Sequence, residues 1–578
     1  MPAPNGAGIL IHMGNCIVKH IGMLLGLAAG LTLTGQTLSG QALAQVPVSP
    51  DITAAFATYD RVTLLVGLLP PDPVALPGAD AATLNAARTQ AIRDRQQAVI
   101  DAIGPDLAVD TRYATIPALA VQVTAAGLAA LQAHPLVTSI APNRLRAPAD
   151  EKGASRLALA PRPIDPARAE GLAVTTPAAP QGDARIGAAP AARPPAPTSA
   201  TRMAQPDNLQ RIGAPALWDV GRVGAGKFVA VLDTGIEASH PAFTGKTVLE
   251  ACFSVNDPAE GAFSLCPGRA PGAIGPGTAS ACPDTSLVAS CRHGTHVAGI
   301  ATGNDPAAGV YGVAPQADVI AVQVFARIWD ERNRRWALSA PTIDSVAGLD
   351  YVASFAQANP GRVASVNMSL GGDEPMRNFC DTSETDDEGD IVTSMMIDRL
   401  RDLGVTTAIA AGNEDFRGAI GAPACVTPAV AVAATNANDT YSVNAGTNLA
   451  AFPLVFIAAP GDLILSAIPG HGYARFSGTS MATPMVAGAL ALLQAAHPGL
   501  QAFDYETTLV RSGRSLVLDG RFRLPRLDLV MADAMLSGNV SGGSLSQPYQ
   551  PNSPVSYVQS PARGNTAWRW YKQQLYVP

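Results

Sequence analysis

The pattern of apolar and polar positions first predicts a small α+β unit over residues 45–146. Strands are expected at 61–69, 118–123 and 137–140, and a short helix around Leu128 and Leu131. A longer helix is expected at 80–103, because Leu84, Ala91, Ala98 and Ile103 share one face and Gly104-Pro105 ends the pattern.

A longer region, 209–537, alternates buried strands with helices. Strands are predicted at 228–232, 319–324, 363–368, 406–411 and 430–434, and helices at 293–301, 342–357, 392–403 and 480–496. Such alternation predicts an α/β fold with a doubly wound, mostly parallel sheet and helices on both faces. Functional side chains are then expected where strands end, as at Asp233, Ser369 and Asn413.

Between and beyond these units the composition changes. Residues 147–208 are rich in alanine and proline and are expected to form an extended linker that is cut during maturation. Residues 538–578 are rich in Ser, Gly, Pro and Gln and end in Trp and Tyr residues. A flexible tail is favoured there, with docking of the aromatic residues as the alternative.

The overall composition limits the class of protein. A length of 578 residues predicts at least two folded units, and 47% hydrophobic residues exclude a chain that is disordered throughout. The formal net charge of -7 gives no electrostatic reason to expect nucleic acid as a partner.

The N-terminal residues 1–44 have the pattern of a secretory signal. A weakly basic Lys19-His20 precedes an apolar segment, and Ala42-Leu43-Ala44 offers a cleavage site. An N-terminal anchor is the alternative, although the apolar segment is short for a membrane span. We therefore expect a secreted protein, extracellular or periplasmic, whose mature form has no stable membrane span.

Six cysteines lie outside the signal, an even number that predicts disulfides in an exported chain. Fifteen pairings are possible in principle. Loop lengths alone favour pairing of neighbours, namely Cys252 with Cys266, Cys282 with Cys291, and Cys380 with Cys425.

The candidate chemistry centres on the stretch 476–484, Phe-Ser-Gly-Thr-Ser-Met-Ala-Thr-Pro, which precedes a long apolar run. This predicts a buried helix that begins at Ser480, where backbone N–H groups and the helix dipole favour a developing anion. A serine nucleophile needs a base and a group that orients the base. His293, in Arg-His-Gly-Thr-His, and Asp233, which ends a strand in Asp-Thr-Gly, are the candidates.

The three motifs, in the order Asp233, His293, Ser480, resemble those of the subtilisin-like serine peptidases. The resemblance covers roughly 209–536 and implies a secreted endopeptidase, made as a zymogen, that cleaves protein or peptide substrates through an acyl-enzyme. It also implies that residues 45–146 are a propeptide, which inhibits the enzyme and assists its folding.

Further site residues follow from the same resemblance. Asn413, in Ala-Ala-Gly-Asn, is similar to the family's oxyanion-hole asparagine, and the segment Ser369, Leu370, Gly371 and Gly372 is similar to its substrate-binding edge. Glu414 either lines the specificity pocket or is a solvated loop carboxylate, and His296 is expected to be a packed or hydrogen-bonded partner.

Metal ions are not expected to take part in the chemistry. Ala242 and Pro306 stand where the family often has calcium-binding side chains, so no calcium site is expected there. The acidic residues between Asp381 and Asp390 could bind calcium by ligand type but lack the EF-hand spacing, and a solvated loop is favoured.

Two other functions remain as alternatives. A non-catalytic binding or surface protein could use the same scaffold, although no residue of the candidate triad is missing. An α/β-hydrolase esterase would need Gly-x-Ser-x-Gly and the order Ser, acid, His, whereas here Ala482 replaces the second glycine and the order is Asp, His, Ser.

Overall fold

The computed structural model describes residues 45–538, with gaps at 73–75, 77, 149–155, 159, 163, 165–167, 169–191, 198–206, 258–260, 283–287, 331–333, 382–389 and 453. The predicted signal, most of the predicted linker and nearly all of the predicted tail therefore lie outside the described residues.

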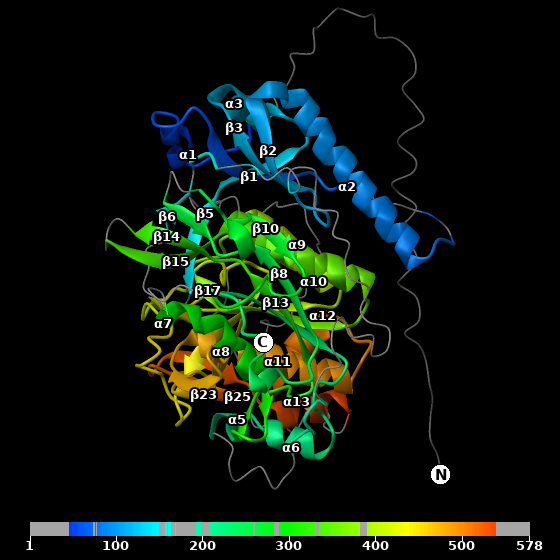
Figure 1. The fold of residues 1–578 in the computed structure, drawn as a ribbon, viewed down its shortest axis with the longest axis vertical. Helices are drawn as coiled ribbons and strands as arrows, with labels where there is room; N and C mark the ends of the chain where they lie inside the picture. Colours follow the sequence, from blue (N-terminus) through cyan, green and yellow to red (C-terminus); the bar gives the residue numbers. More distant parts are fainter. Residues whose placement is uncertain are drawn as a thin grey trace, which may run out of the picture. The chain divides into compact units, whose positions relative to one another are not determined.

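Residues 45–142, the N-terminal subdomain, contain a four-stranded antiparallel sheet of order β2-β3-β1-β4 (Figure 1). Helices α2 and α3 cover one face and bury Val99, Leu128 and Leu131 in a core of their own. The other face contributes Leu65 and Ala120 to a core shared with the following region. The elements are α1 (Pro50–Ala55), β1 (Val62–Leu68), α2 (Ala81–Ile103), β2 (Leu107–Arg112), β3 (Ala118–Val123), α3 (Ala125–Ala133) and β4 (Val137–Pro142).

The buried face of α2 differs from the predicted one. Ala98 is exposed, and the buried residues are Ile92, Gln96, Val99 and Ile103. The Gln96 side chain donates hydrogen bonds to the carbonyls of Tyr113 (2.9 Å) and Ala118 (2.8 Å). A polar residue therefore occupies the centre of the face, because the sheet supplies acceptors for it.

The chain then enters a second sheet, of order β17-β5-β15-β14-β9, with β6 beside β5. Strand β5 is antiparallel to both β15 and β17, so it lies between them. The predicted linker start at 147 therefore falls inside a strand. The elements are β5 (Arg144–Pro148), β6 (Arg156–Leu157), β9 (Ala262–Ser264), β14 (Ala326–Asp330), β15 (Arg335–Pro341) and β17 (Leu370–Gly371).

A ten-stranded sheet organises the remainder, in the order β10-β8-β13-β7-β16-β18-β20-β22-β26-β25. Pairing is parallel from β8 to β26, and the pairs β10–β8 and β25–β26 at the two edges are antiparallel. The predicted mostly parallel sheet is thus confirmed, with five more strands than expected. The strands are β7 (Phe228–Asp233), β8 (Val248–Phe253), β10 (Gly272–Ile274), β13 (Asp318–Gln323), β16 (Val363–Met368), β18 (Thr406–Ala410), β20 (Val430–Thr435), β22 (Val455–Pro460), β25 (Arg514–Leu518) and β26 (Phe522–Arg526).

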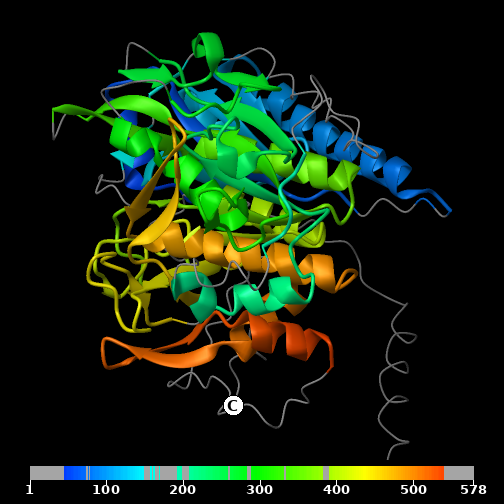
Figure 2. The same ribbon diagram turned by 60° about the horizontal axis from the view of Figure 1, so that its bottom comes forward.

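Helices cover both faces of this sheet, because its strands are apolar on both sides. In β7, Ala230 and Leu232 join the core that includes α9 and α10, whereas Val229 and Val231 join the core that includes α8 and α11. Figure 2 shows α11, in orange, above the β25–β26 hairpin. The helices are α5 (Asp207–Arg211), α6 (Ala214–Asp219), α7 (Val288–Cys291), α8 (His293–Thr302), α9 (Thr342–Ala358), α10 (Ile391–Asp402), α11 (Thr479–Ala496), α12 (Ala502–Ser512) and α13 (Leu529–Leu536).

Three short two-stranded pairs complete the described strands. They are β11 (Asn304–Asp305) with β12 (Val310–Tyr311), β19 (Arg417–Gly418) with β21 (Leu449–Ala450), and β23 (Ile464–Ile468) with β24 (Gly472–Phe476).

Two arginines of the predicted linker are buried, which the composition of that segment did not suggest. Arg162 and Arg168 are 8% and 1% exposed, and both pair with Asp344 near the start of α9. Arg193 forms an ion pair with Asp318 at the start of β13. The described parts of the predicted linker are therefore bound to folded parts of the chain through three basic side chains.

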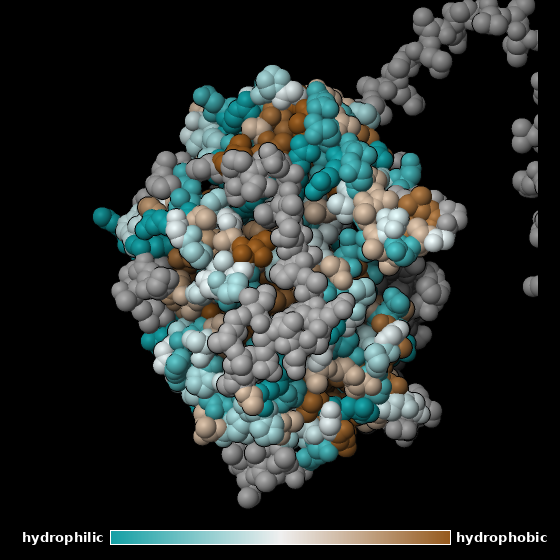
Figure 3. Space-filling model, turned by 45° about the vertical axis from the view of Figure 1, so that its right-hand side comes forward, coloured by the Kyte–Doolittle hydropathy of each residue, from teal (hydrophilic) through white to brown (hydrophobic). Residues whose placement is uncertain are grey.

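Among the described helices, α11 alone has the length and apolarity of a membrane span, but 89% of that window is buried inside the protein. The face in Figure 3 mixes hydrophilic residues with small hydrophobic patches. Helix α11 is therefore explained as the core helix of the large sheet.

The structure confirms all three predicted disulfides, which join Cys252 to Cys266, Cys282 to Cys291, and Cys380 to Cys425.

Candidate active site

Asp233 and His293 meet at the carboxyl end of β7. Asp233 is the last residue of that strand, and His293 is the first residue of α8. His293 Nδ1 lies 2.7 Å from Asp233 Oδ1, with both side chains buried. A carboxylate can only accept a hydrogen bond, so Nδ1 carries the proton and a neutral His293 presents Nε2 as a base.

Two glycines allow this close approach. A Cβ on Gly294 would lie 2.3 Å from the Gly235 carbonyl and 3.1 Å from Asp233 Oδ1. Gly235 itself has a φ of +91°, and its Cβ would meet the Ser280 carbonyl at 2.4 Å. The Thr234 hydroxyl also accepts a hydrogen bond from the Gly294 N–H at 3.0 Å. The glycines in Asp-Thr-Gly and His-Gly-Thr-His are thus steric requirements of the Asp233–His293 pair.

Ser480 is the second residue of α11, at its N-terminal end. Ser369 connects it to the large sheet, since Ser369 Oγ donates to the Ser480 carbonyl (2.9 Å) and Ser480 Oγ lies 3.4 Å from the Ser369 carbonyl. Strand β16 pairs with β7 so that Met368 faces Leu232. The next residues of these two strands, Ser369 and Asp233, are therefore neighbours across a strand spacing of about 4.8 Å.

Helices α8 and α11 also pack closely against each other. A Cβ on Gly488 of α11 would lie 2.8 Å from the Ala301 carbonyl of α8, so a larger residue would separate the two helices. This contact and the β7–β16 register bring all three candidate residues to one edge of the sheet. That edge lies where β7 has β13 on one side and β16 on the other, which is the switch point of the doubly wound sheet.

Asn413 lies beside the start of α11, just after β18. Its Oδ1 accepts hydrogen bonds from the backbone N–H and the hydroxyl of Thr479, both at 2.9 Å. The amide nitrogen, Nδ2, is therefore on the other side of the amide group. A Cβ added to Gly478 would lie only 3.1 Å from this nitrogen. The amide is therefore oriented by Thr479 and faces the turn that precedes Ser480.

Thr479 was not predicted as a site residue. Besides binding Asn413, its hydroxyl accepts the Gly412 N–H at 3.2 Å. The sequence signal was its place next to Ser480, where only a small residue was expected.

The segment Ser369, Leu370, Gly371 and Gly372 follows β16 and includes β17. Strand β17 is paired with β5, with Leu370 facing Pro148 and Gly371 facing Ala147. The Gly372 N–H donates a hydrogen bond to the Ala422 carbonyl at 2.8 Å. The segment therefore pairs with an extended part of this chain, and its binding of substrate stays a prediction.

His296 and Glu414 have mainly structural surroundings. The His296 ring stacks on Phe476 at 4.3 Å, its Nε2 lies 3.0 Å from the Ala474 carbonyl, and burial lowers its pKa to about 3. Glu414 is half-buried and accepts a hydrogen bond from Asn448 Nδ2 at 2.6 Å, while burial raises its pKa. His296 is packed and hydrogen-bonded as predicted, and the half-buried Glu414 does not fit the alternative of a solvated loop carboxylate.

The calcium predictions fall on residues with other partners. The Ala242 N–H is bound by His240 Nδ1, and the Asp305 carboxylate accepts the N–H groups of Ala307 (3.0 Å) and Ala308 (3.1 Å). Pro306 lies in the turn between β11 and β12. That this turn lacks a calcium site stays a prediction.

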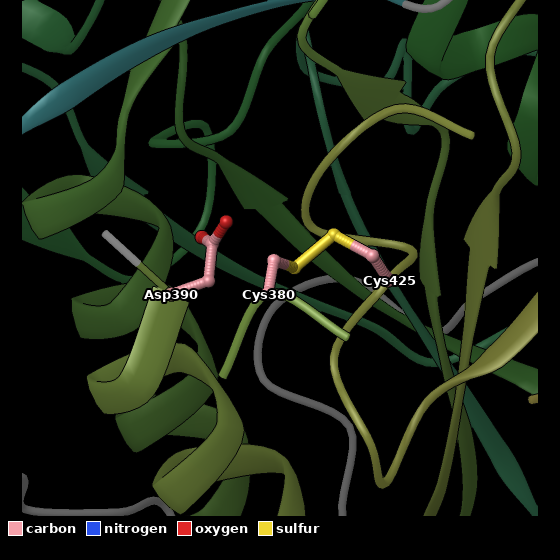
Figure 4. Close-up of side chains that lie close together, drawn as sticks. All are labelled: Cys380, Asp390 and Cys425. Atoms are coloured by element: carbon pink, nitrogen blue, oxygen red, sulfur yellow. A yellow bond between two sulfur atoms is a disulfide. The ribbon is translucent and has the colours of Figure 1, made fainter. Parts of the chain in front are cut away.

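At the acidic segment, Asp381 accepts hydrogen bonds from Ser394 and Thr427, and residues 382–389 lie outside the described part. Asp390 lies close to Cys380 and Cys425 (Figure 4), but these two cysteines are joined in a disulfide. Their sulfurs are therefore not thiolate ligands, and this group is not a metal site.

The sequence profile described as "Subtilase family" (Peptidase_S8) matches residues 224–527, more than half of the chain. Over 294 residues the chain is 32% identical to an intracellular serine protease of Paenibacillus polymyxa, which covers 50% of this chain and 72% of that protein. It is 30% identical over 298 residues to subtilisin E of Bacillus subtilis, covering 51% of this chain and 62% of that protein, which is less than two thirds. An alkaline protease of Shouchella clausii is 32% identical over 341 residues, covering 58% and 71%. With this fold and these relatives, the chain belongs to the subtilase family of serine-type endopeptidases.

Proposed function

We propose that this chain hydrolyses peptide bonds in proteins or peptides through Asp233, His293 and Ser480. The observation that carries the proposal is the 2.7 Å hydrogen bond between Asp233 and His293, at the sheet edge where Ser369 contacts Ser480. The family membership supports the same reaction.

In the proposed mechanism, Ser480 Oγ attacks the carbonyl carbon while His293 Nε2 takes the hydroxyl proton. The C–N bond then breaks, and the proton passes from His293 to the leaving amine. Water releases the acyl group from Ser480 by the same steps in reverse. Asp233 stabilises the imidazolium, and its hydrogen bond to Nδ1 keeps Nε2 available as the base.

The tetrahedral oxyanion would be bound by the Ser480 N–H at the N-terminus of α11 and by Asn413 Nδ2. The position of Asn413 supports this role, because Thr479 occupies its Oδ1 and leaves the amide nitrogen on the side of Ser480. These groups are side chains and backbone N–H groups, so the proposed chemistry needs no cofactor.

We further propose that the enzyme is made as a zymogen with the N-terminal subdomain as its propeptide. Strand β5 fills the position between β15 and β17 that an extended substrate would take. The subdomain is also held by buried polar contacts. Asp350 of α9 accepts the N–H groups of Ala114 (2.8 Å) and Thr115 (2.9 Å), and Arg162 bridges Asp110 and Asp344.

Secretion to the periplasm or the medium is part of the proposal. Three disulfides favour an oxidising compartment, and residues 1–44 have the composition of a signal.

A fluorophosphonate probe tests the proposal, since it labels only an activated serine. Purified, processed protein should be labelled, whereas Ser480→Ala should not be labelled and should accumulate as uncut precursor if maturation is autocatalytic. Ser537→Ala, an exposed serine after α13, is the matched control and should behave as wild type. Wild-type labelling or casein hydrolysis by Ser480→Ala would overturn the assignment, and an unlabelled processed wild-type protein would favour the non-catalytic alternative.

A further inference from the structure

Strand β5 carries two arginines that pair with carboxylates of the peptidase region. Arg146 Nη2 lies 3.0 Å from Asp390 Oδ2, and both side chains are 4% exposed. Arg144 Nη1 lies 3.5 Å from Glu374 Oε2, and the Glu374 side chain is 46% exposed. Strand β5 is therefore bound through its basic side chains as well as its backbone.

Asp390 has neighbours other than β5. It immediately precedes α10, and its side chain forms no capping hydrogen bond with that helix. The Cys380–Cys425 disulfide lies next to it (Figure 4). The positive end of the α10 dipole favours a negative charge at this position. The helix terminus as well as Arg146 therefore favours a carboxylate at this position.

We propose that Asp390 determines substrate specificity, by binding an arginine or lysine side chain of the substrate at the position that Arg146 holds. This inference rests on the proposed peptidase function and adds a substrate class to it. The substrates would be proteins with a basic residue on the N-terminal side of the cleaved bond.

The register of β5 gives the place of that residue. Pro148 faces Leu370 and Ala147 faces Gly371, so a substrate in the same register would place its next residue opposite Ser369. The Ser369 carbonyl lies 3.4 Å from Ser480 Oγ, so the carbonyl of that next residue is the one attacked. Counting back from it, the Arg146 position is the fourth residue before the cleaved bond.

Burial makes this carboxylate selective. A substrate with an apolar fourth residue would bury Asp390 and offer it no opposite charge, whereas arginine would replace the lost water with an ion pair. Glu374 is exposed to solvent, so its pair with a residue two positions earlier contributes little. Selectivity should therefore be concentrated at the fourth residue, with arginine preferred to lysine for its planar, multiply hydrogen-bonding group.

The test compares three quenched peptides that differ only in the fourth residue, which is arginine, norleucine or glutamate. The enzyme is expressed as the full chain and allowed to mature, and mass spectrometry of the products verifies the cleaved bond. We expect kcat/KM for the arginine peptide to exceed that for norleucine by roughly ten- to a hundredfold, with glutamate lowest. Asp390→Asn should bring the first ratio close to one.

Asp402→Asn is the matched control, because it removes the same charge from the exposed, opposite end of α10. It should keep the wild-type preference. Cleavage of all three peptides at similar rates by the wild-type enzyme would overturn the subsite but leave the peptidase function intact. Cleavage of none of them would instead contradict the peptidase function. If Asp390→Asn does not fold, the kcat/KM values of the wild-type enzyme for the three peptides are enough to test the subsite.

Discussion

Gly294→Ala is the sharpest steric test of the candidate active site. The added Cβ would lie 2.3 Å from the Gly235 carbonyl oxygen and 3.1 Å from Asp233 Oδ1. A carbon and an oxygen that are not bonded stay at least about 3.3 Å apart. Either α8 or the turn that contains Gly235, just after Asp233, therefore has to move by about 1 Å. The moving parts are the two ends of the Asp233–His293 hydrogen bond.

The size of the effect follows from that displacement. A misplacement of about 1 Å in a catalytic group costs about a hundredfold in rate, and overpacking of a buried site costs about 1 to 3 kcal/mol of stability. We therefore expect kcat/KM to fall about a hundredfold, together with a lower melting temperature.

The assay measures peptide hydrolysis per active site, with active sites counted by fluorophosphonate titration. Gly404→Ala is the control, because Gly404 follows α10 with a φ of +80° and has no atom within 4 Å of its added Cβ. That variant should lose stability and keep its rate per site. If Gly294→Ala kept both wild-type rate and wild-type melting temperature, the steric reasoning would be refuted.

Three further predictions concern other parts of the site and its support. Asn413→Ala should lower kcat by a factor of about 10² to 10³ with little change in KM, which is the loss that removal of the same donor causes in subtilisin, a relative. A change in KM alone would contradict the oxyanion role. Burial lowers the pKa of His296 to about 3 from 6.5, so the unfolded chain binds a proton more tightly than the folded chain does. The free energy of unfolding should therefore fall as the pH is lowered from 6.5 towards 3. In urea unfolding at several pH values, His296→Phe should show a smaller fall. Replacing Cys380 and Cys425 by serine opens a loop of 45 residues and should cost about 4 kcal/mol in the free energy of unfolding, whereas an unchanged urea midpoint would show that the bond adds nothing.

The large sheet could be predicted because its central strands are apolar on both faces, as in 228–232 and 430–434. Strands with buried polar residues were missed for the opposite reason. In β2, Asp110 is buried with Arg162 as its partner, and in β8, Glu250 accepts the Gly277 and Ala279 N–H groups. Such partners come from distant parts of the chain, so local periodicity does not reveal these strands.

Strand β5 shows the same limit at the candidate site. The segment 144–148 contains two arginines and a proline, which predicts an ordinary boundary between subdomain and linker. It is a strand because β15 and β17 supply backbone partners, and because Asp390 neutralises Arg146. The triad candidates lie in extended motifs and could be named from the sequence. The proposed role of Asp390 could be inferred only from its ion pair with Arg146, which the sequence does not reveal.

The disulfides have a consequence for how the chain matures. Each of the three pairs joins two cysteines that are consecutive along the polypeptide, at separations of 14, 9 and 45 residues. In the export proposed above, the first of these thiols to emerge would therefore meet its native partner before any competing thiol of the six arrives. Oxidation in this order would form the three native disulfides directly. A disulfide isomerase would then have few non-native disulfides to rearrange.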